Sequence, residues 1–270
     1  MGRIELAGAT TLLTGATGGI GRAIAAAMTA RDVRLLLSGR RREELATLAA
    51  QLPAAGTITA DLALADDVAR LCDEAVAAGT QILIANAALP ATGELVDLDQ
   101  AEIDRMLDVN LRAPIALARA LAPSMVARGG GQMVFIASLA GKAASPASSI
   151  YSATKFGLRG FALGLRADLR AHGVGVSLVT PGFISDAGIF ARAGVRLPRG
   201  VATRPPSAVT EAVIRAIERD RAELAVAPAS LRLGAAIASV APELAARGAR
   251  LLGSDRIASQ FAERQRHERS

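Results

Sequence analysis

The chain has 270 residues and a formal net charge of +6; 51% of its residues are hydrophobic and only 3% are aromatic. This composition excludes a disordered chain and indicates a globular protein whose core is filled by small aliphatic side chains. The basic balance suits an anionic cofactor. The arginines are scattered and lack the interleaved aromatic residues that stack on bases, so we expect no nucleic-acid binding.

Cysteine and histidine usage restricts the compartment and the chemistry. The single cysteine, Cys72, cannot form an internal disulfide, which is typical of a reducing compartment. His172 and His267 are isolated, so no metal site is expected. The first residues, MGRIELAG, contain no apolar signal segment, and no run of about 20 apolar residues could span a membrane. These features predict a cytoplasmic protein.

Short apolar runs alternate with helical patterns along the chain. Strands are expected at 9–14, 33–39, 56–62, 81–87, 132–138, 174–182 and 222–228, and helices at 19–32, 41–52, 65–78, 99–128 and 151–173. Almost wholly apolar strands between helices are typical of a parallel sheet that is covered on both faces. The pattern predicts a single doubly wound, Rossmann-like α/β domain over residues 1–228, with ligands at the carboxyl ends of its strands.

Two segments fall outside this alternation. Residues 183–207, rich in glycine and proline, are predicted to form a lid over the site. Residues 229–270 are predicted to be a C-terminal helical extension. Within it, 230–253 is apolar with spaced arginines, which allows ordinary packing, docking on a neighbouring subunit or the substrate pocket, or peripheral contact with a membrane surface. Arg232, Pro242 and Glu243 argue against a membrane span.

The motif TGATGGIG, residues 14–21, follows the first expected strand and opens a helix. Glycines let the backbone approach a pyrophosphate, and the start of the helix supplies free N–H groups and a favourable dipole. A glycine loop alone also fits any tight turn, but its place in the first strand–helix unit favours phosphate binding.

The residues after the second strand bear on which dinucleotide binds. Gly39 stands where an acidic residue would hold the adenosine ribose, and Arg40 and Arg41 follow it. Guanidinium groups suit the 2′-phosphate of NADP, so NADP is the expected cofactor and NAD the alternative. The competing interpretation is that these arginines merely begin an exposed helix.

The segment SIYSATKFG, residues 149–157, contains the only tyrosine and one of the two lysines of the chain. Tyr151 and Lys155 are four residues apart and share a helix face, where the ammonium can lower the pKa of the phenol. Such a tyrosine can exchange a proton with a carbonyl or alcohol oxygen. Ser138, at the end of an expected strand, can hold that oxygen.

Taken together, the motifs resemble those of the short-chain dehydrogenase/reductase family across residues 8–228. The matching elements, in the order and spacing of the family, are TGATGGIG, Asp61, NAA (86–88), Asn110, Ser138, YSATK and PG (181–182). No single element is specific, but the joint pattern is.

The resemblance implies a role for each matching position. It implies that Tyr151 is the general acid/base, that Lys155 lowers its pKa and binds the nicotinamide ribose, that Ser138 orients the substrate oxygen, and that Asn110 holds a water of the proton relay. The implied cofactor contacts are Gly15, Thr17, Gly18, Gly19, Ile20, Gly21, Arg40, Arg41, Asp61, Leu62, Asn86, Ala87, Ala88, Tyr151, Lys155, Pro181, Gly182 and Ile184. The alternatives are that Asn110 only satisfies backbone groups within a helix and that Asp61 only caps the next helix.

The sequence departs from the family at three points. Ala88 replaces the usual glycine, and Asp186 stands where threonine is common, which puts that contact with the nicotinamide carboxamide in doubt. The glycine spacing also fits the extended branch of the family, but too little chain follows residue 182 for the larger substrate domain of that branch.

We therefore predict an NADP-preferring oxidoreductase that interconverts a ketone and a secondary alcohol. An apolar substrate is expected because the pocket positions are Leu89, Leu139, Ala143, Ile150, Phe183, Ile189 and Phe190. The alternatives are an epimerase or dehydratase of the same fold and a non-catalytic NADP-binding regulator. The resemblance also implies a homodimer or homotetramer formed through the helices near 99–128 and 151–172.

Overall fold

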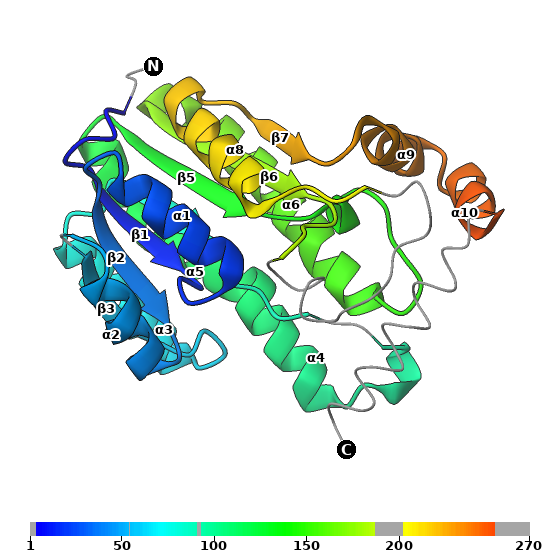
Figure 1. Cartoon of the computed structure of the whole chain (residues 1–270), viewed down its shortest axis with the longest axis horizontal. Coiled ribbons are helices and arrows are strands. Elements are labelled where there is room, and N and C mark those ends of the chain that lie inside the picture. The colour runs from blue at the N-terminus through cyan, green and yellow to red at the C-terminus, as the bar shows by residue number, and fades with distance from the viewer. Residues whose placement is uncertain (1–3, 54, 91–92, 187–201, 252–270) are drawn as a thin grey trace.

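The computed structural model describes residues 4–53, 55–90, 93–186 and 202–251, and seven parallel strands in this part of the chain form one sheet (Figure 1). The strands are β1 (Thr10–Thr14), β2 (Arg34–Gly39), β3 (Ala55–Thr59), β4 (Ile82–Ala85), β5 (Gly131–Ile136), β6 (Val174–Pro181) and β7 (Glu223–Val226). Each predicted strand is present, with ends shifted by up to three residues. The predicted doubly wound α/β fold is thus confirmed.

The strand order is β3-β2-β1-β4-β5-β6-β7. The connections run outward from β1 in one direction and from β4 in the other, so the order reverses between these two strands. In open parallel sheets, ligands bind at the carboxyl ends of the strands where the order reverses. The loops after β1 and β4 therefore mark the edge at which a cofactor site is expected.

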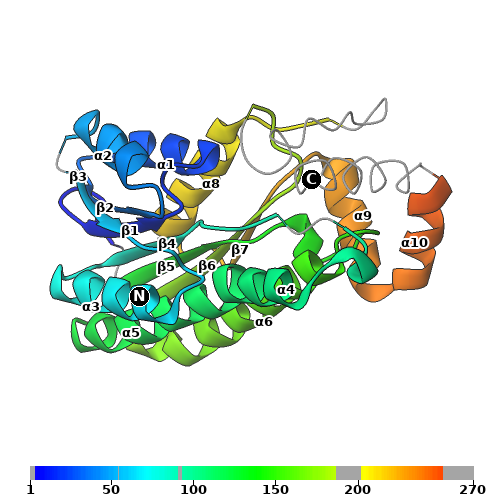
Figure 2. The same ribbon diagram turned by 90° about the horizontal axis from the view of Figure 1, so that it is seen from below.

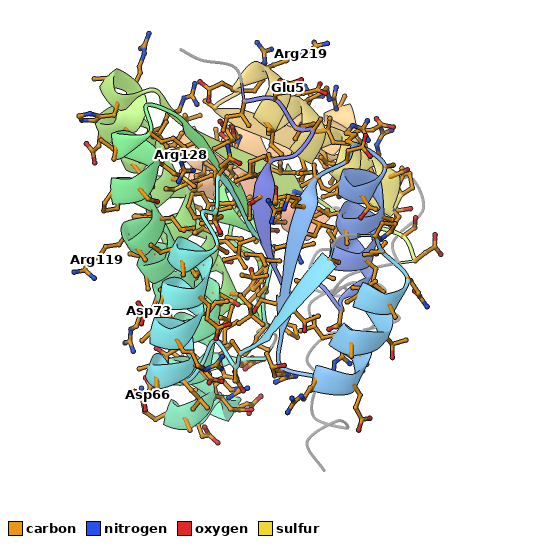
Figure 3. The ribbon with its side chains drawn as sticks, turned by 90° about the vertical axis from the view of Figure 1, so that its left-hand side faces the viewer. Glu5, Asp66, Asp73, Arg119, Arg128 and Arg219 are labelled. Atoms are coloured by element: carbon orange, nitrogen blue, oxygen red, sulfur yellow. The ribbon has the colours of Figure 1, made fainter. Side chains whose placement is uncertain are left out.

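Helices cover both faces of the sheet (Figure 2). The first face carries α1 (Gly19–Thr29), α2 (Arg42–Ala50) and α8 (Pro206–Arg219), and the second carries α3 (Ala65–Ala77), α5 (Ala113–Ala127) and α6 (Ser149–Leu169). Figure 3 shows Asp66, Asp73 and Arg119 pointing outward from α3 and α5. Apolar strands are required here because both sheet faces are buried.

The helical segment predicted for residues 99–128 is present over residues 100–127, but it is not a regular α-helix throughout. The chain forms α4 (Gln100–Leu107), a π-helical turn at Asp108–Arg112, and then α5. Pro114 has no N–H to donate to the carbonyl of Asn110 four residues earlier, so the α-helical bonding pattern cannot continue through this point. The wider turn places Asn110 in the interior, with no exposed surface. Turns of this kind occur often at functional sites.

After β7 the chain continues into α9 (Ala229–Val240) and α10 (Pro242–Leu251), which pack against each other. Figure 1 shows the two helices at the right-hand end of the molecule, beyond the carboxyl ends of β6 and β7. Within the described residues, no helix is long and apolar enough to cross a membrane. Most of the segment predicted to be a lid, residues 187–201, lies outside the described residues.

Candidate active site

The glycine motif forms a tight turn between β1 and α1. Gly15 has a φ of +63°, and a Cβ built on it would lie 2.7 Å from the Cα of Ala87 in the loop after β4. A Cβ on Gly21 would lie within van der Waals overlap of the carbonyl oxygen of Gly15. Glycine is therefore required at 15 for the loop after β4 to approach this closely, and at 21 for the turn to close against the start of α1.

The loop after β4 is fastened to this turn by polar contacts. The amide nitrogen of the Asn86 side chain donates to the carbonyl oxygens of Thr14 and Gly15, at 3.1 Å each. The Thr14 hydroxyl accepts hydrogen bonds from the backbone N–H groups of Asn86 and Ala87, also at 3.1 Å. Asn86 thus holds the two loops together. Thr14, the first residue of the glycine motif, was not predicted as a site residue, although its hydroxyl at the end of β1 joins the two loops.

Arginines gather beside the same turn. Arg41 donates from Nη2 to the Thr17 hydroxyl at 3.1 Å and forms an ion pair with Glu44, with Nη1 and Oε1 2.9 Å apart. Gly39 lies next to Thr17, since a Cβ built on it would lie 3.7 Å from the threonine Oγ1. Arg40 is exposed. The end of β2 therefore presents two guanidinium groups near the phosphate turn, one of which is already anchored.

Asp61 follows β3 and has contacts that the sequence analysis did not anticipate. Its Oδ2 lies 2.7 Å from Nη2 of Arg105, on α4, and its Oδ1 accepts the backbone N–H of Ala63 at 3.0 Å. Burial alone would raise the pKa of Asp61, but these two bonds, with the charges of Arg105 and Arg40, hold that pKa below its usual value. The carboxylate does not cap α3, whose N-cap is Leu64.

Asn110 connects the π-helical turn to the loop after β4. Its Oδ1 accepts the backbone N–H of Leu89 at 2.7 Å, and its Nδ2 donates to the carbonyl of Leu89 at 3.0 Å. The same Nδ2 lies 3.4 Å from the hydroxyl of Thr154, on α6. The backbone-satisfying role considered for Asn110 is therefore present, but its partner is the loop after β4 rather than its own helix.

Ser138, Tyr151 and Lys155 come together at the carboxyl edge of β5. Ser138 follows that strand and its Oγ accepts the N–H of Ala140 at 3.1 Å, while its side chain also makes a hydrogen bond with Tyr151. Lys155 is buried, donates from Nζ to the carbonyl of Ile136 at 3.2 Å, and has this nitrogen 5.6 Å from the centre of the Tyr151 ring. Tyr151 itself is half-buried.

Burial governs the ionisation of this group. It raises the pKa of Tyr151 to about 12, and the hydrogen bond with Ser138 only partly opposes the rise. Burial also lowers the pKa of Lys155 to about 8. The lowering of the phenol pKa expected from the lysine is not seen here, because desolvation dominates and the hydrogen bond with Ser138 is what opposes it. At neutral pH the phenol keeps its proton and the lysine is largely charged.

The remaining predicted contacts lie after β6. Pro181 ends this strand, the N–H of Gly182 donates to the carbonyl of Val226 at 3.0 Å, and a Cβ on Gly182 would lie 3.2 Å from the Cδ1 of Leu139. Ile184 is buried and pairs with Arg204 in an isolated bridge. Asp186 is exposed with a φ of +58°. Of the proposed pocket positions, Ile189 and Phe190 lie outside the described residues.

The turn after β1 and the residues after β2 contain groups that fit a dinucleotide phosphate. The N-cap of α1 is Gly18, whose position is not capped by a side chain, so the first N–H groups of α1 are left for a ligand. The two guanidinium groups after β2 suit an additional phosphate. Among the described residues, no group of three or more His, Cys, Asp or Glu side chains gathers as a metal site would require. The arrangement can thus hold a phosphate-bearing cofactor and exchange a proton through Tyr151.

Comparisons with known proteins agree with this geometry. A family model described as short chain dehydrogenase matches residues 9–193. The chain is 34% identical over 227 residues to the ketoacyl reductase HetN of Nostoc sp.. This aligned region covers 82% of this chain and 79% of that protein.

Solved structures are similar as well. A short-chain dehydrogenase from Sphingobium yanoikuyae in complex with NADPH superimposes with a TM-score of 0.75 at 31% identity, covering 80% of this chain and 87% of that one. A bulky-bulky ketone specific alcohol dehydrogenase from Comamonas testosteroni gives a TM-score of 0.73 at 27% identity, covering 80% and 85%.

Proposed function

Since the chain belongs to the short-chain dehydrogenase/reductase family and is an NAD(P)-dependent oxidoreductase acting on CH–OH groups, we propose that it interconverts an apolar ketone and a secondary alcohol, with NADPH as the preferred cofactor. The observation that carries this proposal is the meeting of Ser138, Tyr151 and Lys155 at the carboxyl edge of β5. NADPH, when bound, supplies the hydride that reduces the carbonyl carbon.

The residues of the chain then transfer a proton to the substrate oxygen. The Ser138 hydroxyl donates a hydrogen bond to the substrate oxygen, and Tyr151 transfers its phenolic proton to that oxygen as charge develops on it. The raised pKa of the phenol, about 12, keeps the proton available at neutral pH. The buried ammonium of Lys155 stabilises the phenolate that is left. Alcohol oxidation follows the same path in reverse.

Substitution of Tyr151 tests this role directly. Tyr151→Phe removes the transferable proton but keeps the ring, so turnover should fall at least about a hundredfold. NADPH affinity, measured by fluorescence titration of the cofactor, should change less than about twofold because the phosphate sites are untouched. Substantial residual turnover would contradict the proton-transfer role.

A ketone panel separates the alternatives. The proposed enzyme consumes NADPH in proportion to the ketone reduced, an epimerase gives no net consumption, and a regulator gives no turnover. The apolar pocket residues favour bulky hydrophobic ketones within the panel; Leu89, Leu139, Ile150 and Phe183 are the largest of those that the structure describes.

The preference for NADPH rests on the arginines after β2. We propose that Arg40 and Arg41 bind the 2′-phosphate, with Arg41 held in place by Thr17 and Glu44. Arg40→Ala should raise the KM for NADPH about tenfold or more and leave the KM for NADH nearly unchanged. Arg42→Ala, one residue further on and also exposed, is the matched control and should leave both constants unchanged. Equal effects of Arg40→Ala on the two cofactors would defeat the assignment.

Assembly into a homodimer or homotetramer is part of the same proposal. Phe156 and Leu163 are exposed seven residues apart on α6, so they lie on one face of that helix. A second copy packed along α6 would cover both side chains. Light scattering coupled to gel filtration gives the mass and hence the number of copies.

A further inference from the structure

Helix α9 exposes most of its large aliphatic side chains to the surface. Ala235 is its one buried residue and Leu231 and Ala238 are partly buried, whereas its other large aliphatic side chains face outward. Leu233, Ile237 and Val240 are 64%, 42% and 83% exposed, and Leu244 on α10 is 65% exposed. We call Leu233, Ile237 and Val240 the C-terminal apolar patch.

The spacing of these residues makes the patch continuous on α9. Positions 233, 237 and 240 fall within an arc of about 60° at 100° per residue, and Ala235 lies on the opposite side of the helix. Single exposed hydrophobic residues are ordinary on protein surfaces, but a row of large aliphatics on one outward face indicates an interaction site. Packing within the described protein does not explain these side chains.

Charge decides between the candidate occupants. Arg232, next to Leu233 on α9, and Arg247, on α10, are both exposed, and Glu243 is the only acidic residue of α9 and α10. A second copy docked patch to patch would bring these arginines together. The segment 187–201 contains three arginines and no acidic residue, and 252–270 is also net basic. Neither segment therefore offers the negative charge that Arg232 and Arg247 would attract. A surface rich in negative charge does.

We propose that α9 and α10 dock the protein on an anionic lipid surface, with the C-terminal apolar patch entering the headgroup boundary and the arginines binding lipid phosphates. Exposed aliphatic side chains beside basic residues are what an interfacial helix requires. Because α9 begins directly after β7, docking brings the carboxyl edge of the sheet, where the candidate active site lies, toward the lipid (Figure 1). An apolar substrate could then reach the site from the membrane.

Co-sedimentation with vesicles tests the proposal without cofactor or substrate, so its outcome is independent of the proposed reaction. The full chain should bind vesicles of phosphatidylcholine mixed with phosphatidylglycerol and should not bind phosphatidylcholine alone. The triple variant Leu233→Ser, Ile237→Ser, Val240→Ser should bind about tenfold less or weaker still. Val76→Ser is the matched control, because Val76 is 39% exposed but lies near the C-terminal end of α3, at the amino edge of the sheet. It should bind as the unaltered protein does.

A second variant and two further measurements keep the test decisive. Arg232→Gln with Arg247→Gln should weaken binding to the anionic vesicles several-fold, and added salt should do the same. The proposal is overturned if the full chain does not bind anionic vesicles, or if the triple variant binds them equally well. It is also overturned if the triple substitution instead reduces the oligomer mass, because the patch would then bind a second copy. A lower Tm of the triple variant, with no vesicle binding by the unaltered chain, would overturn it too, because the patch would then pack internally.

Discussion

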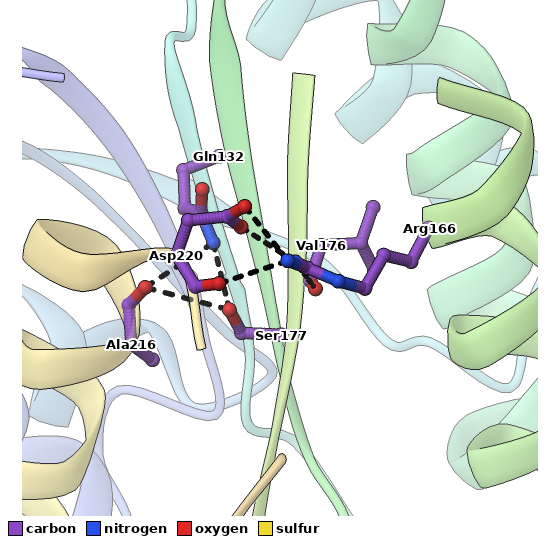
Figure 4. Close-up of polar contacts among 6 residues, drawn as sticks. All are labelled: Gln132, Arg166, Val176, Ser177, Ala216 and Asp220. Carbon is purple, nitrogen blue, oxygen red and sulfur yellow. Dashed lines mark hydrogen bonds and ion pairs between the residues drawn. The ribbon is translucent and has the colours of Figure 1, made fainter. Parts of the chain in front are cut away.

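The two ends of helix α6 carry charged groups in opposite circumstances. At its C-terminal end, Arg166 forms a two-nitrogen ion pair with Asp220, in which Nη2 lies 2.8 Å from Oδ2, and donates to the carbonyl of Val176 at 2.7 Å (Figure 4). Beside it, the Gln132 side chain donates to the Ser177 hydroxyl at 2.8 Å. At the N-terminal end, the ammonium of Lys155 donates to a neutral carbonyl, and the phenol of Tyr151 is half-buried.

The difference separates structural from reactive polar groups. At the amino edge of the sheet, the charges neutralise each other and nearby carbonyls accept the remaining protons, so the network joins α6, β6 and the turn after α8. At the carboxyl edge, burial shifts the pKa of both Tyr151 and Lys155 toward their neutral forms. Groups whose pKa is perturbed by burial at a site are candidates for chemistry, whereas a closed ion pair stabilises the fold.

Replacing Lys155 should have the largest effect on turnover, and it should also change how the free energy of unfolding depends on pH. Lys155→Met should reduce turnover at least about a hundredfold because the phenolate loses its cation. Lys142→Met is the matched control, since Lys142 is the other lysine of the chain and pairs with Glu223 at 3.0 Å. It should leave turnover within about threefold.

The same variant should alter the dependence of stability on pH. The folded-state pKa of Lys155, about 8, is below its unfolded value, so between about pH 8 and 10.5 the unfolded chain binds one proton more than the folded one. The free energy of unfolding therefore rises with pH in this window. Between pH 7.5 and 9.5 this rise should be about 2 kcal/mol smaller in Lys155→Met than in the unaltered protein, as measured by urea unfolding. Identical slopes would show that the ammonium is not buried.

Breaking the ion pair at the other end of α6 should cost stability and spare the chemistry. Asp220→Ala leaves the Arg166 charge unpaired and should lower the free energy of unfolding by about 2 to 3 kcal/mol, less than for a fully buried pair because both side chains are about a quarter exposed. Turnover of the folded fraction should be unchanged. Asp220 has a φ of +44°, which asparagine tolerates, so Asp220→Asn should be milder than Asp220→Ala. A loss of turnover with full stability would contradict the contrast between the two ends.

Removing Asn110 should have the smallest effect on folding and a moderate one on turnover. Asn110→Ala deprives the N–H and the carbonyl of Leu89 of their partners and should lower the free energy of unfolding by about 1 kcal/mol. Because the loop after β4 loosens, turnover should fall about tenfold. Thr154→Val removes only the 3.4 Å contact with Asn110 Nδ2 and the bond to the carbonyl of Tyr151, and it should affect turnover less. Unchanged turnover in Asn110→Ala would show that this residue has no role in the reaction.

The fold could be predicted from the sequence because its strands are buried on both faces and therefore form apolar runs. Each strand was located, and the order of chemistry-bearing motifs placed Ser138, Tyr151 and Lys155 together. The helical segment around Asp108–Arg112 was predicted but its π-helical turn was not, although Pro114 marks it, because apolar periodicity continues through the segment. A missing N–H changes the bonding pattern without changing the pattern of hydrophobic residues.

Contacts between segments distant in the chain could not be predicted. Arg105 lies 44 residues from Asp61, and Arg166 lies 54 residues from Asp220, so no local spacing links either pair. The rise in the pKa of Tyr151 was also out of reach, because it depends on how completely the ring is covered and not on which residue follows one helical turn later. The roles assigned to the individual site residues stay predictions until the variants are measured.

Tyr151 is the only tyrosine, and the chain has no tryptophan. The near-ultraviolet absorbance and the intrinsic fluorescence of phenol in this protein therefore originate from a single ring, and that ring lies in the candidate active site. An alkaline spectrophotometric titration would report the ionisation of this one group without any label or correction for others. The protein thus contains its own chromophore at the point where substrate binding and proton transfer are proposed to occur.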